Sequence, residues 1–279
     1  MIDLDKVKDY RVLLIGDAIT DEYRYVKTIG KAVKENALSA LVGKTETFRG
    51  GVWAAAQHTL GFCAHVDVLH GQHVMWNTRL VDDVYLRKLF VLHERREYEV
   101  VSQDYDIRDY DVVIITDFGH GTMTKELIAR VSKEARYLAV NAQTSSTNYG
   151  FNLITKYRGR ADFVVVDELE ARLAAHDDCS PIEDVILDLG FKKLIVTLGA
   201  NGAVGFDGAF ERVTARTRNV VDTMGCGDAF LCVAAPFAAA GYSMKQLLNI
   251  GNAAGAVKLG IVGHRGSVSR EALEAHLNG

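Results

Sequence analysis

The sequence predicts an α/β fold in which helices flank a doubly wound, mostly parallel sheet. Two observations support this prediction. Short runs of aliphatic and β-branched residues recur near residues 14, 67, 114, 138, 164 and 195, as expected for buried parallel strands. Segments with the apolar spacing of helices lie between these runs. Strands and helices that alternate along a chain are typical of doubly wound sheets.

Each element has a local basis in the sequence. The first strand, RVLLIG, is a continuous apolar run, and HVDVL, DVVIIT, RYLAV, DFVVV and KLIVT resemble it. Residues 123–132 have helical spacing behind Thr122 or Thr124, either of which can accept a capping hydrogen bond. Residues 168–175 and 182–189 have the same spacing, and Pro181 precedes the second of them, where helices favour proline.

Two segments interrupt the alternation. Residues 22–48 and 78–94 show partial alternation of polar and apolar residues, which predicts strands outside the main sheet. Open α/β sheets bind ligands beyond the carboxyl ends of their strands, so an insertion directly after the first strand can cover that crevice. We therefore expect a single domain over residues 1–279, with a small inserted β lid.

Length, charge and cysteine spacing narrow the class of protein. A chain of 279 residues can bury a large core, and 32 Lys and Arg against 36 Asp and Glu give a net charge of -4 without a dense basic run. This argues against nucleic acid as a partner. The start of the chain has early acids and only a short apolar run, unlike a signal peptide or a membrane span. The four cysteines form no CxxC pair. We expect a cytoplasmic protein without a membrane partner, a disulfide or structural zinc.

The stretch VVDTMGCGDAFLCVAAPFAAAG, residues 220–241, places two glycines and an aspartate before a long apolar run. A helix N-terminus exposes N–H groups that attract anions, and glycines let an anion approach the backbone. Because Asp228 would repel a static phosphate, it is better suited to accept a proton from an attacking hydroxyl. This pattern indicates phosphoryl transfer. The alternative is that Asp222 or Asp228 caps the helix and the glycines form a tight turn.

DTMGCGDAF resembles the second signature of the ribokinase, or PfkB, family of sugar and nucleoside kinases. VLLIGDAITDEY is similar to the family's first strand and substrate turn, and FRGGVWAAAQHTLGF to its first glycine signature. VTLGANGAVGF and NIGNAAGAVKLG resemble its nucleotide-binding elements, so the resemblance extends over nearly the whole chain. DVVIITDFGHG is similar to a segment of those family members that phosphorylate heptose 7-phosphate. The resemblance implies a ribokinase-like sheet with a small β lid.

The resemblance also implies roles for individual residues. Asp228 would be the catalytic base, and the N–H groups of Gly225, Cys226 and Gly227 would hold the transferring phosphoryl group. The residues expected to hold the acceptor are Asp17, Asp21, Gly50, Gly51 and Asp117. Those expected to line the nucleotide are Thr197, Gly199, Gly202, Thr223 and Asn252. VVDELE stands where the family has an NxxE motif near magnesium, which assigns Asp167 and Glu170 to the metal.

Cations near the proposed lid favour a phosphorylated acceptor. Lys31, Lys34, Lys44 and Arg49 lie around the lid and the glycine turn, and Arg87 and Lys88 lie on the opposing lid segment. Arginine makes forked contacts with phosphate oxygens, so we expect Arg49 and Arg87 to hold a substrate phosphate. The alternative is that all six are solvated lid charges.

The chain departs from the family pattern at three places. Ala54 stands where the glycine signature has an asparagine, and NAQTSS stands where heptose kinases read DPKG, so that Asn141 and Gln143 replace charged groups. The stretch between VDVLHG and Arg79 is also shorter, as if a helix and a strand were missing. These departures leave the acceptor open.

The leading hypothesis is therefore an ATP- and Mg²⁺-dependent carbohydrate kinase. It would transfer the γ-phosphoryl group to a hydroxyl of a sugar or sugar phosphate, with heptose 7-phosphate as one candidate. One alternative is a nucleoside or other small-alcohol kinase of the same fold. The other is a degenerate kinase that binds nucleotide or sugar as a regulator. Lid strands in the family often pair between subunits, which predicts a homodimer.

Overall fold

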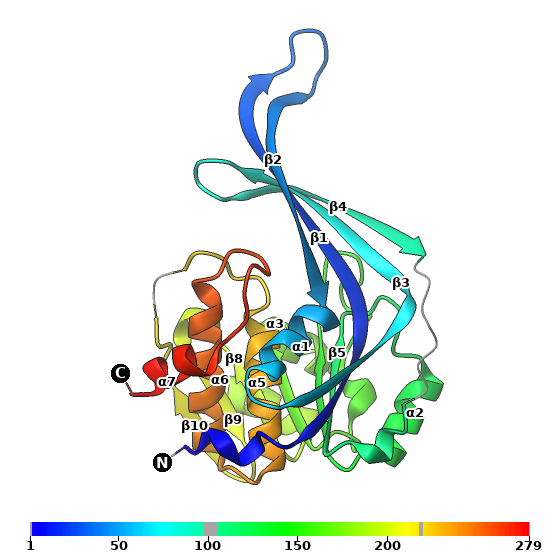
Figure 1. Ribbon diagram of the computed structural model, residues 1–279, viewed down its shortest axis with the longest axis vertical. Coiled ribbons are helices and arrows are strands. Elements are labelled where there is room, and N and C mark those ends of the chain that lie inside the picture. The colour runs from blue at the N-terminus through cyan, green and yellow to red at the C-terminus, as the bar shows by residue number, and fades with distance from the viewer. Residues whose placement is uncertain (1, 98–104, 218–219, 279) are drawn as a thin grey trace.

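The computed structural model describes residues 2–97, 105–217 and 220–278 and contains one mixed sheet of ten strands (Figure 1). Along the sheet the order is β10 (Phe210–Val213), β9 (Ala203–Phe206), β8 (Leu194–Thr197), β7 (Phe163–Asp167), β6 (Leu138–Ala142), β5 (Val112–Asp117), β1 (Arg11–Lys31), β3 (His65–Asp82) and β4 (Lys88–Glu97). β2 (Leu38–Gly51) pairs with β1. The strands from β8 to β3 are parallel to their neighbours, whereas β2, β4, β9 and β10 are antiparallel to theirs.

Helices cover both faces of the central strands because successive side chains of a strand point to opposite faces. Val12 and Leu14 of β1 contribute to one core, whereas Leu13 and Ile15 contribute to the other. The first core is covered by α1 (Val52–Leu60), α5 (Cys226–Ala239), α6 (Met244–Leu259) and α7 (Arg270–Asn278). The second is covered by α2 (Lys125–Glu134), α3 (Glu168–Ala175) and α4 (Ile182–Leu189). This arrangement confirms the predicted doubly wound fold.

All three predicted helices form: α3 and α4 match the predicted ranges, whereas α2 begins at Lys125 and not at the predicted residue 123. Thr124 accepts a hydrogen bond from the Leu127 N–H at 3.2 Å and caps α2, and Pro181 directly precedes α4. Four short 3₁₀ helices complete the secondary structure of the described residues, at Leu4–Val7, Ile107–Asp109, Ile154–Tyr157 and Gly199–Asn201. None of the helices in the described part of the chain is long and apolar enough to cross a membrane.

The outer parts of β1 and β3 extend beyond the helices and, with β2 and β4, form a projecting sheet (Figure 1). We define the projecting sheet as residues 20–31, 38–49, 74–82 and 88–97. The sequence predicted lid strands separate from the main sheet, but β1 and β3 run from the main sheet into it without a break. The predicted boundary at residue 78 is therefore wrong, because β3 stays paired with β1 from His65 to Asp82 across one irregularity.

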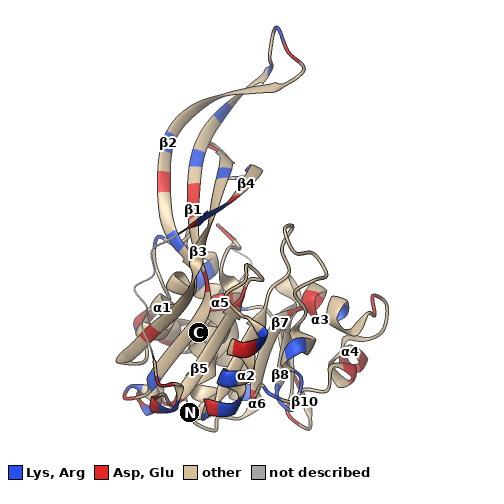
Figure 2. Ribbon diagram, turned by 90° about the vertical axis from the view of Figure 1, so that its right-hand side faces the viewer, with Lys and Arg blue, Asp and Glu red and all other residues tan. Residues whose placement is uncertain are grey.

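The continuity of β3 also explains why the stretch between VDVLHG and Arg79 is short. Parallel pairing jumps from Gly16 and His70 to Ala18 and Val74, so a short bulge stands between the two parts of the strand. The chain passes directly from the core to the projecting sheet there, with no intervening helix. Figure 2 shows that charged residues of both signs lie along β1 and β2 of the projecting sheet.

Candidate active site

Three adjoining cavities lie at the carboxyl ends of the parallel strands. The central cavity is bordered by the β7–α3 turn and the N-terminus of α5. A second cavity, here the sheet-side cavity, lies below the projecting sheet and shares Gln143 and Asp228 with the central one. A third, the outer cavity, lies between the turn after β8 and α6. It shares a larger set with the central cavity: Thr197, Gly199, Thr223, Cys226 and Gly227.

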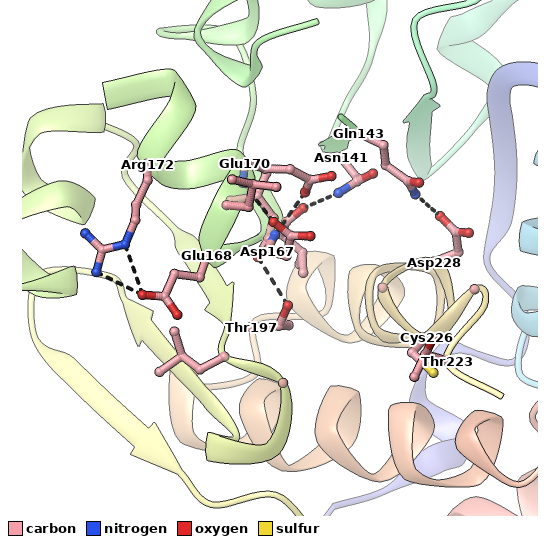
Figure 3. A pocket seen from close by; sticks show the side chains of 17 residues that line it. Asn141, Gln143, Asp167, Glu168, Glu170, Arg172, Thr197, Thr223, Cys226 and Asp228 are labelled. Atoms are coloured by element: carbon pink, nitrogen blue, oxygen red, sulfur yellow. Dashed lines mark hydrogen bonds and ion pairs between the residues drawn. The ribbon is translucent and has the colours of Figure 1, made fainter. Parts of the chain in front are cut away.

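Asp228 stands in the wall between the central and sheet-side cavities. Its residue is only 6% exposed, and burial raises the pKa of its carboxyl to about 6. Gln143 Nε2 donates a hydrogen bond to Asp228 Oδ1 at 2.5 Å, and Figure 3 shows the two side chains pointing toward one another. A carboxylate with a pKa near 6 is deprotonated at neutral pH and basic enough to accept a proton.

The N-terminus of α5 opens toward the central cavity. Gly225 is its N-cap, with φ of 74°, and no side chain caps the helix there. The alternative in which Asp222 or Asp228 caps the helix is not what the structure shows. Asp222 instead accepts hydrogen bonds from the Met224 and Gly263 N–H groups. Gly225, Cys226 and Gly227, which we call the anion cradle, all line the central cavity.

Two acids lie on the other side of the central cavity, at the start of α3 (Figure 3). Asp167 and Glu170 form a capping box, in which Asp167 Oδ1 accepts from the Glu170 N–H and Glu170 Oε2 accepts from the Asp167 N–H. The Thr144 N–H donates to Glu170 Oε1 at 3.0 Å. Burial, and then the charge of Asp167, raise the pKa of Glu170 to about 8. A nearby cation would favour its charged form.

The sheet-side cavity contains a buried ion pair. Asp21 Oδ1 accepts from Arg79 Nη2 at 2.9 Å and Nε at 3.1 Å, and His264 Nε2 lies 3.5 Å from Asp21 Oδ2. Burial alone would raise the pKa of Asp21, but the contacts with His264 and Arg79 outweigh it and lower the pKa. Gly51 lines the same cavity, and a Cβ on Gly50 would lie 2.5 Å from Asp21 Oδ2. The structure thus brings Asp21, Gly50 and Gly51 together.

Asp17 and Asp117 do not line the cavities, contrary to expectation. Asp17 accepts three backbone hydrogen bonds from the turn after β5, donated by Phe118, His120 and Thr122 at 3.0–3.1 Å. Asp117 is 1% exposed, accepts a hydrogen bond from the Tyr157 hydroxyl, and forms an ion pair with Lys156. Both carboxylates are committed to holding the turn that borders the sheet-side cavity.

Arg49 and Arg87 also lie away from the cavity residues. Arg49 pairs with Thr20 across β1 and β2, whereas Ile19 and Asp21 face the sheet-side cavity. Because neighbouring side chains alternate, Arg49 lies on the opposite face, where its guanidinium stacks on Trp53. Arg87 stacks on Tyr85 in the exposed turn between β3 and β4. The structure therefore does not place these two arginines, expected at a substrate phosphate, among the residues that line the three cavities.

The residues expected at the nucleotide do come together. Gly202 and Asn252 line the outer cavity, and Thr197, Gly199 and Thr223 line both the outer and the central cavity. Gly202 has φ of 89°, and a Cβ there would meet the Val213 carbonyl oxygen, so this position requires glycine. Asn252 Nδ2 donates to the Thr214 carbonyl at 2.6 Å and so fixes one edge of the cavity.

Several contacts around the cavities could not be predicted from the sequence. In the sequence Gln143 is only a departure from a motif, yet its side-chain amide donates to Asp228. Arg79 pairs with Asp21 across 58 positions, a separation that leaves no local signal. Asp222 joins the anion cradle to the projecting sheet, because it accepts from Lys88 Nζ at 2.8 Å and from the Tyr23 hydroxyl at 3.1 Å. Its position in the DTMGCGD motif could have drawn attention to it.

Comparisons with solved structures show the same fold. The chain aligns with the Arabidopsis thaliana ribokinase in complex with ribose and ATP at a TM-score of 0.70 and 14% identity, covering 97% of this chain and 99% of that one. It aligns with the Burkholderia thailandensis nucleoside kinase in complex with inosine at a TM-score of 0.67 and 16% identity, covering 96% and 97%.

Curated relatives are similar in sequence over most of this chain. The bifunctional protein HldE of Desulfatibacillum aliphaticivorans is 26% identical over 322 residues, covering 99% of this chain and 64% of that protein. HldE of Nitratiruptor sp. is 23% identical over 293 residues, covering 91% and 62%. This chain therefore spans less than two thirds of the length of these relatives.

Residues 102–270 match the family model of the pfkB family carbohydrate kinases. The matched range contains the DTMGCGD motif, the acids at the start of α3 and the residues of the outer cavity. Because the match covers more than half of its 279 residues, the chain belongs to the pfkB family of carbohydrate kinases.

Proposed function

We propose that this protein is an ATP-dependent kinase that transfers a γ-phosphoryl group to a hydroxyl of a sugar or sugar phosphate. The observation that carries the proposal is the position of Asp228 in the wall between two cavities. A nucleotide would extend from the outer into the central cavity, and the acceptor would occupy the sheet-side cavity. Asp228 then stands where the acceptor hydroxyl meets the γ-phosphate.

The chain's own groups support each part of the transfer. Gln143 donates to Asp228 Oδ1, which leaves Oδ2 to accept the proton of the acceptor hydroxyl. As the hydroxyl oxygen forms its bond to the γ-phosphorus, the bond from that phosphorus to the β–γ bridging oxygen breaks and ADP leaves. The N–H groups of the anion cradle stabilise the negative charge on the transferring group, which is the main requirement of phosphoryl transfer.

The residues of the central cavity fit a magnesium ion. All candidate ligands are oxygens, and Asn141 Oδ1 is buried there without a hydrogen-bond partner among the described residues. In the described part of the chain, Asp167, Glu170 and Asp228 do not form a cluster compact enough to bind an ion directly. Asp167 and Glu170 would therefore hold Mg²⁺ through water, as this ion prefers. When bound, it would neutralise charge on the nucleotide phosphates.

The sheet-side cavity favours a sugar-sized acceptor over a nucleoside. Its volume is about 280 Å³, at the small end of ligand cavities. Asn77, Gln143, Ser145, Ser146 and Thr147 provide amides and hydroxyls for a polyhydroxylated ligand. Arg79, His93, His120 and His264 also line it and could receive a phosphate in place of Arg49 and Arg87. The resemblance to the heptose-phosphate branch makes heptose 7-phosphate the first candidate.

An ATP-consumption screen tests the proposal. Purified protein with Mg²⁺ would be assayed against free sugars, their phosphates and nucleosides, and the product would be identified by mass spectrometry. We expect turnover with a hexose or heptose derivative, and phosphorylated and dephosphorylated forms of the best acceptor would then be compared by kcat/KM. Turnover confined to nucleosides would favour the nucleoside kinase. Nucleotide binding without turnover on any acceptor would favour the regulator.

Glu170→Gln should raise the Mg²⁺ concentration needed for half-maximal activity by about tenfold, in the range typical of lost outer-shell metal partners. The fold should persist because glutamine can also complete a capping box. Magnesium titrations of initial rate, together with acceptor KM, measure the effect. Glu126→Gln, at the exposed first turn of α2, is the matched control. An unchanged magnesium requirement would remove Glu170 from the metal site.

The projecting sheet should mediate a homodimer. Its large apolar side chains are strongly exposed, among them Leu38, Leu41, Val42, Phe90 and Leu92 at 53–84%. Burial of this surface between two copies would remove it from water. We expect light scattering to give a dimer at micromolar concentration, and Leu41→Lys with Phe90→Lys to give a monomer. Leu187→Lys, at an exposed position of α4, controls for added charge. A monomeric wild type would contradict this.

A further inference from the structure

Lys258, in the last turn of α6, is a lysine that the mechanism above does not use. It is 0% exposed, although lysine is rarely buried fully without a charged partner. Its Nζ donates to the Gly263 carbonyl at 2.7 Å and to the Ile261 carbonyl at 3.4 Å. Both acceptors are neutral, so these hydrogen bonds orient the ammonium group without cancelling its charge.

The side chain of Lys258 lies directly behind the anion cradle. A Cβ placed on Gly225, the N-cap of α5, would lie 3.4 Å from Lys258 Cε. The turn before Gly225 is also attached to α6, because the N–H groups of Val221 and Asp222 donate to the Leu259 carbonyl at 2.9 and 3.2 Å. These hydrogen bonds hold the segment that leads into the cradle against the end of α6, which carries Lys258.

The surroundings of Lys258 combine burial with negative charge at longer range. Burial lowers the pKa of its ammonium, whereas the carboxylates of Asp222 and Asp228 act in the opposite direction. Asp222 already pairs with Lys88, and Asp228 accepts from Gln143. A buried cation without a close counter-ion is costly, and an anion bound in the cradle would offset that cost.

We propose that Lys258 is a positioning residue whose ammonium group adds a positive charge beside the anion cradle. This inference rests on the proposed function, in which the cradle receives nucleotide phosphates. The helix N-terminus contributes only about half a unit charge, and the buried ammonium adds a whole one close to Gly225. As a consequence, the cradle should bind a nucleoside triphosphate more tightly than a diphosphate, because the triphosphate carries more negative charge. ATP would then readily replace the product ADP.

Nucleotide binding by calorimetry tests this inference. The ligands are adenosine, ADP and the non-hydrolysable β,γ-methylene analogue of ATP, and the variant is Lys258→Gln, whose amide can still donate to the carbonyls. We expect affinity for the ATP analogue to fall about tenfold or more, and affinity for adenosine to change less than about twofold. Lys245→Gln, which removes an exposed charge from the same helix, should leave all three affinities unchanged.

The outcomes separate an electrostatic role from a structural one. Equal losses for adenosine and the ATP analogue, or no loss for either, would overturn the role of Lys258. If Lys258→Gln does not fold, Lys258→Met fills the space without a polar group and is measured in its place. A wild type that binds none of the three ligands would instead overturn the proposed function, and this inference with it.

Discussion

Asp228→Asn should lower turnover by about 10²- to 10⁴-fold, the usual contribution of a general base, while changing ATP affinity little. Asparagine keeps the size of the side chain and its hydrogen bond with Gln143, but it cannot accept the proton of the acceptor hydroxyl. Initial rates at saturating substrates, with nucleotide binding measured separately, give both quantities. Asp207→Asn, in the exposed turn after β9, is a matched control that should retain full activity.

The pH profile provides an independent check of the base. Since burial raises the pKa of Asp228 to about 6, the wild-type rate should fall as pH decreases through that value and the carboxylate becomes protonated. The residual activity of Asp228→Asn should lack this acidic limb. Near-normal turnover in the variant, or an unchanged acidic limb, would exclude Asp228 as the base.

The fold was predictable because its determinants are local. Continuous apolar runs specify central strands, and caps such as Thr124 specify where helices begin. What local patterns could not show is the extent of β1 and β3, since a strand's length depends on the partner beside it. β3 continues to Asp82 because β1 pairs with it, and no signal within residues 65–82 reports that pairing.

The candidate site was predictable only in part, for a related reason. Glycine spacing and the position of Asp228 before an apolar run identify an anion-binding helix end from the sequence. The sequence places Asp17 directly after the apolar run of the first strand and Asp117 at the end of β5, which indicates the correct edge of the sheet. It does not indicate which groups donate hydrogen bonds to the two carboxylates. Their partners come from the turn after β5 and from Tyr157 and Lys156. Likewise, the register between β1 and β2 decides which face of the sheet Arg49 occupies, and it places Arg49 on the face away from the sheet-side cavity.

Among the substitutions proposed, we expect a change in the buried pair of Asp21 and Arg79 to have the largest effect on stability. Asp21→Asn should lower the free energy of unfolding by about 3 kcal/mol, because it leaves the Arg79 guanidinium, 17% exposed at its side chain, without its counter-charge. The same change should weaken acceptor binding in the sheet-side cavity. Chemical denaturation and acceptor KM measure the two effects. In the wild type, the lowered pKa of Asp21 means that its stabilisation is present at neutral pH and is lost as pH falls below about 4.

Glu22→Gln, one residue along the same strand, is the matched control. Glu22 pairs with Arg24, whose side chain is 47% exposed, and solvent screening limits such a pair to less than about 1 kcal/mol. The double variant Asp21→Asn with Arg79→Met should recover part of the lost stability, because it removes the uncompensated charge, but it should not recover acceptor binding. A small effect of Asp21→Asn, equal to that of Glu22→Gln, would show that water reaches Arg79. The sheet-side cavity would then have to hold its acceptor without a fixed carboxylate.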